Sequence, residues 1–186
     1  KIGGKTPYAY VADNDYAMGL FVEYLSKSPI WKETAIFIVE DDAQNGSDHV
    51  DAHRTTAYVA GGFVKRGFVD HTPYSTSSML RTMELILGLP PMSQYDASAT
   101  PMFRCFSSKA DLSVFKHIVP TVDLFEKNTK ENASSRLSEK FDFSKEDSVP
   151  DLELNQVIWK AVRGENSEMP APRRAALLNT AGGDEY

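Results

Sequence analysis

The 186-residue sequence contains little cysteine, no excess of positive charge and no long hydrophobic run. Its one cysteine, Cys105, cannot form an internal disulfide, and it excludes a metal site built from several thiolates. Twenty basic residues against 26 acidic ones give a net charge of -6. Non-specific nucleic-acid binding depends on basic side chains that release counterions, so we expect no nucleic-acid partner. No apolar run approaches the roughly 20 residues needed to cross a bilayer, so we expect no membrane span.

The first part of the chain has the patterns of an α/β domain. Residues 35–39 are continuously apolar and rich in β-branched side chains, which predicts a strand buried on both faces of a parallel sheet. A second strand is expected at residues 55–60. Acidic residues at 13–15 predict the start of a helix that ends before Pro29, and Ser75 and Thr76 predict the start of another that ends at Gly88.

The second part of the chain differs from the first in its pattern of polar and apolar residues. After residue 106, charged and polar stretches separate small apolar groups, and no strand pattern is present. Apolar spacing predicts one helix over residues 151–162 and a shorter one over residues 173–178. We therefore divide the chain into an α/β part, residues 1–106, and an extension, residues 107–186, that packs on it.

Acidic and histidine side chains are concentrated in residues 40–54, which we call the acidic loop. Seven of its 15 residues are Asp, Glu or His, whereas the whole-chain frequency, 30 in 186, would give about two. The loop leaves the carboxyl end of a predicted strand, where ligands of open α/β sheets bind. Crowded carboxylates repel one another, and oxygen and imidazole ligands suit Zn²⁺ or Mn²⁺. A solvated turn with local Asp and Asn hydrogen bonds explains the same composition, so both interpretations stay open.

Four segments occur in an order that resembles a known family. They are VADND at 11–15, WKETAIFIVEDDAQNG at 31–46, DHVDAHR at 48–54 and SMLRTMELILGLPP at 78–91. Together they resemble the carboxy-terminal part of bacterial phosphoesterases, the phospholipase C and acid phosphatase-like members of the alkaline phosphatase superfamily. The resemblance covers residues 6–106 and continues more loosely through 154–159 and 169–172.

The resemblance implies a fold, a reaction and a metal site. The fold is a partial alkaline phosphatase-like sandwich, a mostly parallel sheet flanked by helices, with a mainly helical and irregular C-terminal extension. The reaction is metal-dependent hydrolysis of a phosphoric ester with two divalent ions, Zn²⁺ by preference and Mn²⁺ or Ca²⁺ as alternatives. Asp41 and Asp42 match one ligand pair, and His53 matches a later ligand.

Three neighbouring residues have less definite roles. Glu40, His49 and Arg54 lie next to the matched ligands, where they would support a ligand or contact phosphate. His49 is equally compatible with an ordinary loop residue. Arg54 has the alternative of pairing with a nearby carboxylate, because so many acids surround it.

The resemblance places the nucleophile and the other ligands upstream, in an amino-terminal half that is absent here, so we expect no catalytic residue in this piece. The sequence starts at Lys1 without an initiator Met or a secretion signal, which leads us to expect a processed or truncated piece, inactive alone. Expected partners are a phosphate ester, the missing half of the same protein and a second copy in a homodimer. Relatives suggest a periplasmic or secreted location. The alternatives are a non-catalytic surface or interaction module that retains the fold, and a stable proteolytic product.

Overall fold

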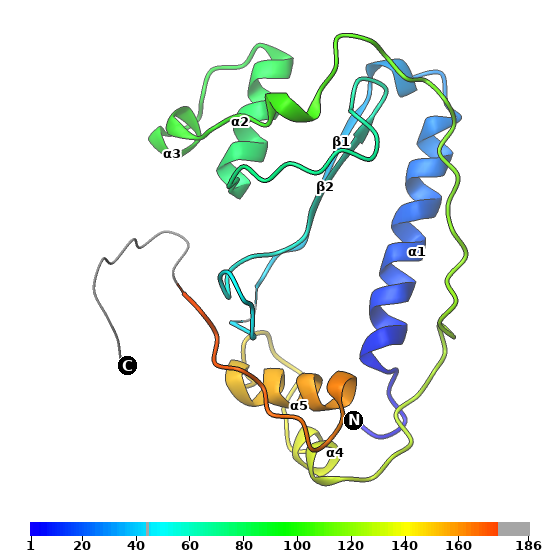
Figure 1. The fold of residues 1–186 in the computed structure, drawn as a ribbon, viewed down its shortest axis with the longest axis vertical. Helices are drawn as coiled ribbons and strands as arrows, with labels where there is room; N and C mark the ends of the chain where they lie inside the picture. Colours follow the sequence, from blue (N-terminus) through cyan, green and yellow to red (C-terminus); the bar gives the residue numbers. More distant parts are fainter. Residues whose placement is uncertain (44, 175–186) are drawn as a thin grey trace. The chain divides into compact units, whose positions relative to one another are not determined.

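The computed structural model describes residues 1–43 and 45–174, which form an α/β chain with a small antiparallel sheet and five α-helices (Figure 1). The elements in order are α1 (Pro7–Ser26), the 3-10 helix η1 (Trp31–Glu33), β1 (Ala35–Val39), β2 (Ala57–Gly61), α2 (Thr76–Leu87), α3 (Gln94–Ser98), the 3-10 helix η2 (Phe103–Cys105), α4 (Ala133–Ser138) and α5 (Asp151–Arg163). The chain divides into two compact units. Of the described residues, unit 1 holds 1–18, 40–55 and 118–174, and unit 2 holds 19–39 and 56–117.

The sheet of unit 2 consists of β1 and β2, which pair antiparallel with Phe37 opposite Val59. Both strands lie where the sequence predicts them, but the parallel neighbours expected for residues 35–39 are not found in the part of the chain that the structure describes. A parallel pair needs a crossover connection, usually a helix. The described residues between the two strands contain no helix, so the chain returns antiparallel. The prediction that β1 is buried on both faces is also wrong, because its residues are half-buried or exposed.

Helix α1 begins earlier than the acidic residues at 13–15 indicate. Its first residue is Pro7, whose fixed φ suits the first helical position and whose missing N–H costs nothing there. The Thr6 hydroxyl accepts a hydrogen bond from the Ala9 N–H at 3.1 Å, which caps the helix. Asp13 lies within the helix instead, where its carboxylate pairs with Lys5 Nζ at 2.8 Å. The predicted start was wrong because the Thr6 cap was overlooked.

The core of unit 2 forms around α2. Ser75 caps this helix in a capping box with Ser78, and Gly88 ends it at φ 69, a conformation that glycine adopts without strain. Both ends match the prediction. The Thr82 hydroxyl accepts a hydrogen bond from the Met102 N–H at 2.9 Å, which joins η2 to the helix. The side chains that form and cover this core are Met79, Met102, Cys105, Phe37, Val59, Tyr74, Met83 and Phe106.

An extended segment of unit 2 runs along the C-terminal half of α1. The Phe115 N–H donates to Ser26 Oγ at 3.0 Å, and the His117 N–H donates to Glu23 Oε2 at 2.9 Å. The His117 ring and the Lys27 ammonium also contact the Glu23 carboxylate. These interactions, with Lys27 the strongest, lower the pKa of Glu23 from 4.5 to about 2.

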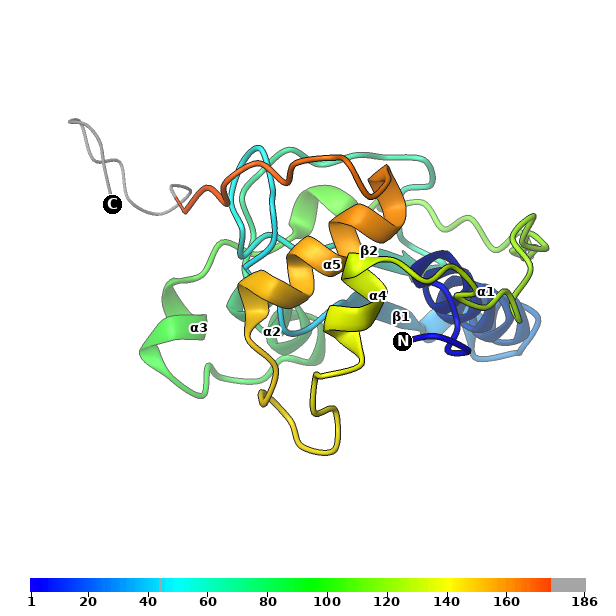
Figure 2. The same ribbon diagram turned by 90° about the horizontal axis from the view of Figure 1, so that it is seen from below.

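Unit 1 contains the two C-terminal helices, α4 and α5, which pack side by side (Figure 2). Helix α5 confirms the helix predicted over residues 151–162. Of the helix predicted over 173–178, Arg173 is not helical and Arg174 forms an isolated β-bridge, and the remainder lies outside the described residues. No helix among the described residues is long and apolar enough to cross a membrane.

The Ser75 cap gives a direct test of what holds α2 in place. Ser75→Ala removes the side-chain acceptor of the Ser78 N–H, which keeps the Ser75 carbonyl as its other acceptor, and we expect the free energy of unfolding to fall by about 1 kcal/mol. Urea denaturation measures this change. Thr76→Ala, an exposed change at the next position, is the matched control and should leave stability nearly unchanged.

The lowered pKa of Glu23 predicts a loss of stability in acid. Because its folded pKa lies below its ordinary value, Glu23 stabilises the fold above pH 4.5, and this contribution disappears as the pH falls toward 2. Glu23→Gln should therefore be less stable than the parent at pH 7 and should lose less stability on acidification. Urea unfolding followed by fluorescence of the buried Trp31 measures both effects. The exposed Glu33→Gln is the control, and an acid dependence equal in all three proteins would contradict the prediction.

Candidate functional site

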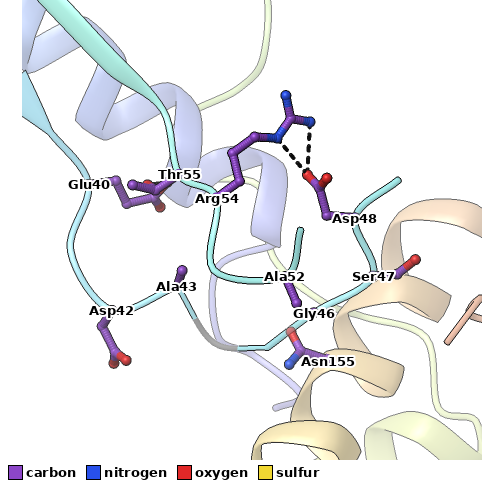
Figure 3. Close-up of a pocket in the computed structure, with 10 residues that line it drawn as sticks. All are labelled: Glu40, Asp42, Ala43, Gly46, Ser47, Asp48, Ala52, Arg54, Thr55 and Asn155. Carbon is purple, nitrogen blue, oxygen red and sulfur yellow. Dashed lines mark hydrogen bonds and ion pairs between the residues drawn. The ribbon is translucent and has the colours of Figure 1, made fainter. Parts of the chain in front are cut away.

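The acidic loop lies in unit 1 and folds around a small open pocket of about 250 Å³ (Figure 3). The pocket is lined by Glu40, Asp42, Ala43, Gly46, Ser47, Asp48, Ala52, Arg54, Thr55 and Asn155. All of these come from the acidic loop and Thr55 beside it, except Asn155, which comes from α5. The pocket therefore has a strongly acidic lining with one arginine.

Asp48 organises the middle of the loop. Its Oδ1 accepts hydrogen bonds from the N–H groups of Val50 and Asp51, at 2.6 and 3.1 Å. Its Oδ2 accepts from Arg54 Nε at 3.2 Å and Arg54 Nη2 at 2.9 Å, as Figure 3 shows. One carboxylate thus closes the turn at 48–51 and ties it to Arg54 by charge-assisted bonds.

The same contacts set the charge of Asp48. The hydrogen bonds from Arg54, followed by the backbone N–H of Val50, lower the pKa of Asp48 from 3.8 to about 2. Asp48 is therefore ionised at neutral pH, and its oxygens already accept four hydrogen bonds. This carboxylate acts as a structural anchor, and it is poorly suited to transferring protons.

Asp51 holds the ring of His53. Asp51 Oδ1 accepts the backbone N–H of His53 at 2.8 Å and lies 2.8 Å from His53 Nδ1. Asp51 is buried, with 6% of its surface exposed, whereas the His53 side chain is 62% exposed. The imidazole is thus fixed at Nδ1 by a buried carboxylate and open to solvent over most of its surface.

More distant parts of unit 1 hold the loop from outside. The Ala52 N–H donates to the Arg173 carbonyl at 2.6 Å, and Asp51 forms a β-bridge with Arg174. The Arg173 guanidinium donates to the His49 carbonyl at 3.2 Å. From α5, Asn155 approaches so closely that a Cβ at Gly46 would lie 2.9 Å from its Oδ1. Residues 173–174 and α5 therefore fix the backbone of the loop.

The structure brings some of the predicted site residues to the pocket and leaves others outside it. Glu40, Asp42 and Arg54 line the pocket, whereas Asp41, His49 and His53 do not. Glu40 Oε2 accepts a hydrogen bond from the Thr55 hydroxyl at 3.2 Å. Arg54 pairs with the carboxylate of Asp48, which was one of its two expected roles.

The two predicted carboxylate ligands differ in backbone conformation. Asp41 and Asp42 are both exposed, and Asp42 has φ 47, in the left-handed region that Asp and Asn tolerate better than other side chains. In Figure 3 the Asp42 carboxylate turns away from the Asp48–Arg54 pair. The tight backbone at Asp42 therefore directs this carboxylate away from the centre of the loop.

The loop has side chains of the right chemical type to bind a divalent ion, but too few of the described ones lie close together. Carboxylate oxygens and an imidazole held by a buried carboxylate are typical ligands of Zn²⁺ and Mn²⁺. Within residues 1–43 and 45–174, however, no group of three or more His, Cys, Asp or Glu side chains lies close enough to hold a metal. A metal at this loop would therefore need ligands beyond those that the described residues bring together.

Asp48, Asp51 and Asn155 had no role expected from the sequence. The first two had a local signal, because an Asp two or three residues before a turn N–H is a common turn anchor. Asn155 had none, since it lies more than 100 residues further along the chain and reaches the loop only through the fold.

The anchoring role of Asp48 predicts a local effect on hydrogen exchange. Asp48→Ala removes the acceptor of the Val50 and Asp51 N–H groups, so their exchange should accelerate while that of the α2 amides stays unchanged. Exchange measured by NMR tests this. Asp41→Ala removes the same charge from an exposed site in the same loop, and equal acceleration in both variants would mean that Asp48 anchors nothing.

Comparisons with protein-family models, with curated proteins and with solved structures find no match for this chain.

Proposed function

We propose that this chain is part of a metal-dependent phosphoric ester hydrolase, a phosphoesterase of the alkaline phosphatase superfamily, and that its acidic loop supplies part of a two-metal site. One observation carries the proposal. The loop that follows β1 carries five acidic residues and an imidazole whose Nδ1 is held by a buried Asp. Metal-binding histidines typically have such a carboxylate behind them.

Each residue of the loop has a definite task in this proposal. Asp41, Asp42 and His53 hold the ions, with Zn²⁺ preferred over Mn²⁺ or Ca²⁺. Bound there, the two ions would supply Lewis acidity to a phosphoryl group. Asp48 and Arg54 keep the turn closed behind these ligands. Glu40 stands at the end of β1, and its bond from Thr55 ties the two arms of the loop together.

The nucleophile and the remaining ligands are proposed to come from polypeptide outside this chain, joined to it as the other half of an alkaline phosphatase-like sandwich. The incomplete ligand set supports this. So does the sheet, since the described residues form two strands and the proposed sandwich needs a larger sheet. Helix α2 also leaves large apolar side chains exposed, namely Leu85, Ile86 and Leu87. We further propose a periplasmic or secreted location and a phosphate ester substrate.

A second candidate is a non-catalytic module that retains the fold. The observation that favours it is the same lack of three converging ligands among the described residues. Such a module would keep the Asp48–Arg54 turn, because that turn needs no metal. The two candidates therefore differ in metal binding and turnover, and they agree on the structure of the loop.

Substitution of the proposed ligands in the intact protein tests the hydrolase. Asp42→Asn keeps a side chain that tolerates the left-handed backbone, so it removes charge with little strain. We expect Asp42→Asn and His53→Gln each to abolish turnover of an aryl phosphate and to weaken Zn²⁺ binding in calorimetry, because each removes a ligand. Release of the phenol measures turnover.

The controls match the chemistry of each change. Asp147→Asn alters another exposed Asp with positive φ, 53, outside the loop, and His71→Gln alters another exposed histidine. Both should keep parental turnover and affinity. Near-normal turnover in Asp42→Asn and His53→Gln would remove these residues from the site. Absence of both turnover and metal binding in the intact parent would favour the non-catalytic module.

A further inference from the structure

We infer that Asp51 is a positioning residue for His53: it fixes the ring in the form protonated at Nδ1, so that Nε2 is the atom presented to a metal. The inference rests on the proposed function for the identity of the ligand. The tautomer itself follows from the hydrogen bonds of Asp51 and His53 alone.

The direction of the hydrogen bond decides the tautomer. A carboxylate can only accept, so the 2.8 Å contact between Asp51 Oδ1 and His53 Nδ1 requires the proton to sit on Nδ1. In the neutral ring, Nε2 then carries the lone pair. The contact keeps Nδ1 occupied, while the side chain as a whole is 62% exposed. Nε2 is therefore the nitrogen that remains available to a ligand.

Asp51 is itself held in place through its backbone and through its side chain. Its own N–H donates to Asp48 Oδ1, its backbone bridges Arg174, and its Oδ1 also accepts the His53 N–H at 2.8 Å. With 6% of its surface exposed, Asp51 is more buried than any other acid of the loop. A fixed, desolvated carboxylate can impose one orientation on an exposed ring, which an exposed carboxylate would do only weakly.

Asp51 Oδ1 accepts both hydrogen bonds from His53, and this predicts which substitution should preserve the Nδ1–H form of the ring. In Asp51→Asn, the His53 N–H needs an oxygen at the same point, so the amide oxygen should face His53 and keep the Nδ1–H form. In Asp51→Ala both bonds are lost, and the ring should shift toward the Nε2–H form that free histidine prefers. Asparagine is therefore a rescuing variant and alanine a disrupting one.

Nitrogen-15 NMR of the histidine rings in the intact protein, recorded at alkaline pH, tests the inference. His53→Gln assigns the His53 signals. We expect the Nδ1–H pattern in the parent and in Asp51→Asn, and a shift toward Nε2–H in Asp51→Ala. The His49 ring, which is 84% exposed and 4.0 Å from Asp48, should respond to neither change and serves as the internal control.

Addition of Zn²⁺ separates the inference from the function on which it rests. We expect Zn²⁺ to move the Nε2 signal of His53 in the parent, and calorimetry should show Zn²⁺ affinity about 10- to 100-fold lower in Asp51→Ala, with Asp51→Asn closer to the parent. An unchanged tautomer in Asp51→Ala overturns the positioning role even if Zn²⁺ binds. A tautomer that follows Asp51 while Zn²⁺ leaves Nε2 unmoved overturns the ligand assignment and, with it, the role of His53 in the proposed function.

Discussion

The structure of the acidic loop depends on the Asp48 carboxylate. Its two oxygens accept four hydrogen bonds, two from backbone N–H groups and two from Arg54. One of the backbone donors belongs to Asp51, so the bond that closes the turn also places the residue that holds His53. The position of the exposed imidazole is therefore set through two carboxylates, Asp48 and Asp51.

The negative charge of the acidic loop is partly balanced by arginines that come from elsewhere in unit 1. Residues 40–54 contain five acids and one arginine, and on that ground alone a bound cation is an attractive counter-charge. The fold adds two further arginines, since Arg173 donates to the His49 carbonyl and Arg174 to Asn45 Oδ1. Part of the repulsion is thus offset by the chain itself. The case for a metal therefore depends on the geometry of His53 more than on the number of acids.

Local signals were sufficient for those elements whose boundaries are made by neighbouring residues. Ser75 and Gly88 bound α2, and the β-branched run at 35–39 forms β1. The direction of the β1–β2 pair was not predictable from the run itself, because it depends on whether the connection contains a helix. Within the site, the loop and its pairing of Arg54 with an acid were foreseen. The contacts from Asn155 and Arg173 were not, since they join residues more than 100 positions apart.

If the proposed hydrolase is correct, the exposed apolar side chains of unit 2 and the incomplete ligand set of unit 1 have one common explanation. Among the described residues, β1 has a partner along one edge only, and it ends at Val39, where the acidic loop begins. A further strand added parallel to β1 along its other edge would end beside Glu40, since the carboxyl ends of parallel strands meet at one edge of a sheet. The same strand would extend the two-stranded sheet that packs against α2. In the proposed hydrolase, completing the sheet and supplying the remaining ligands would then be one structural event.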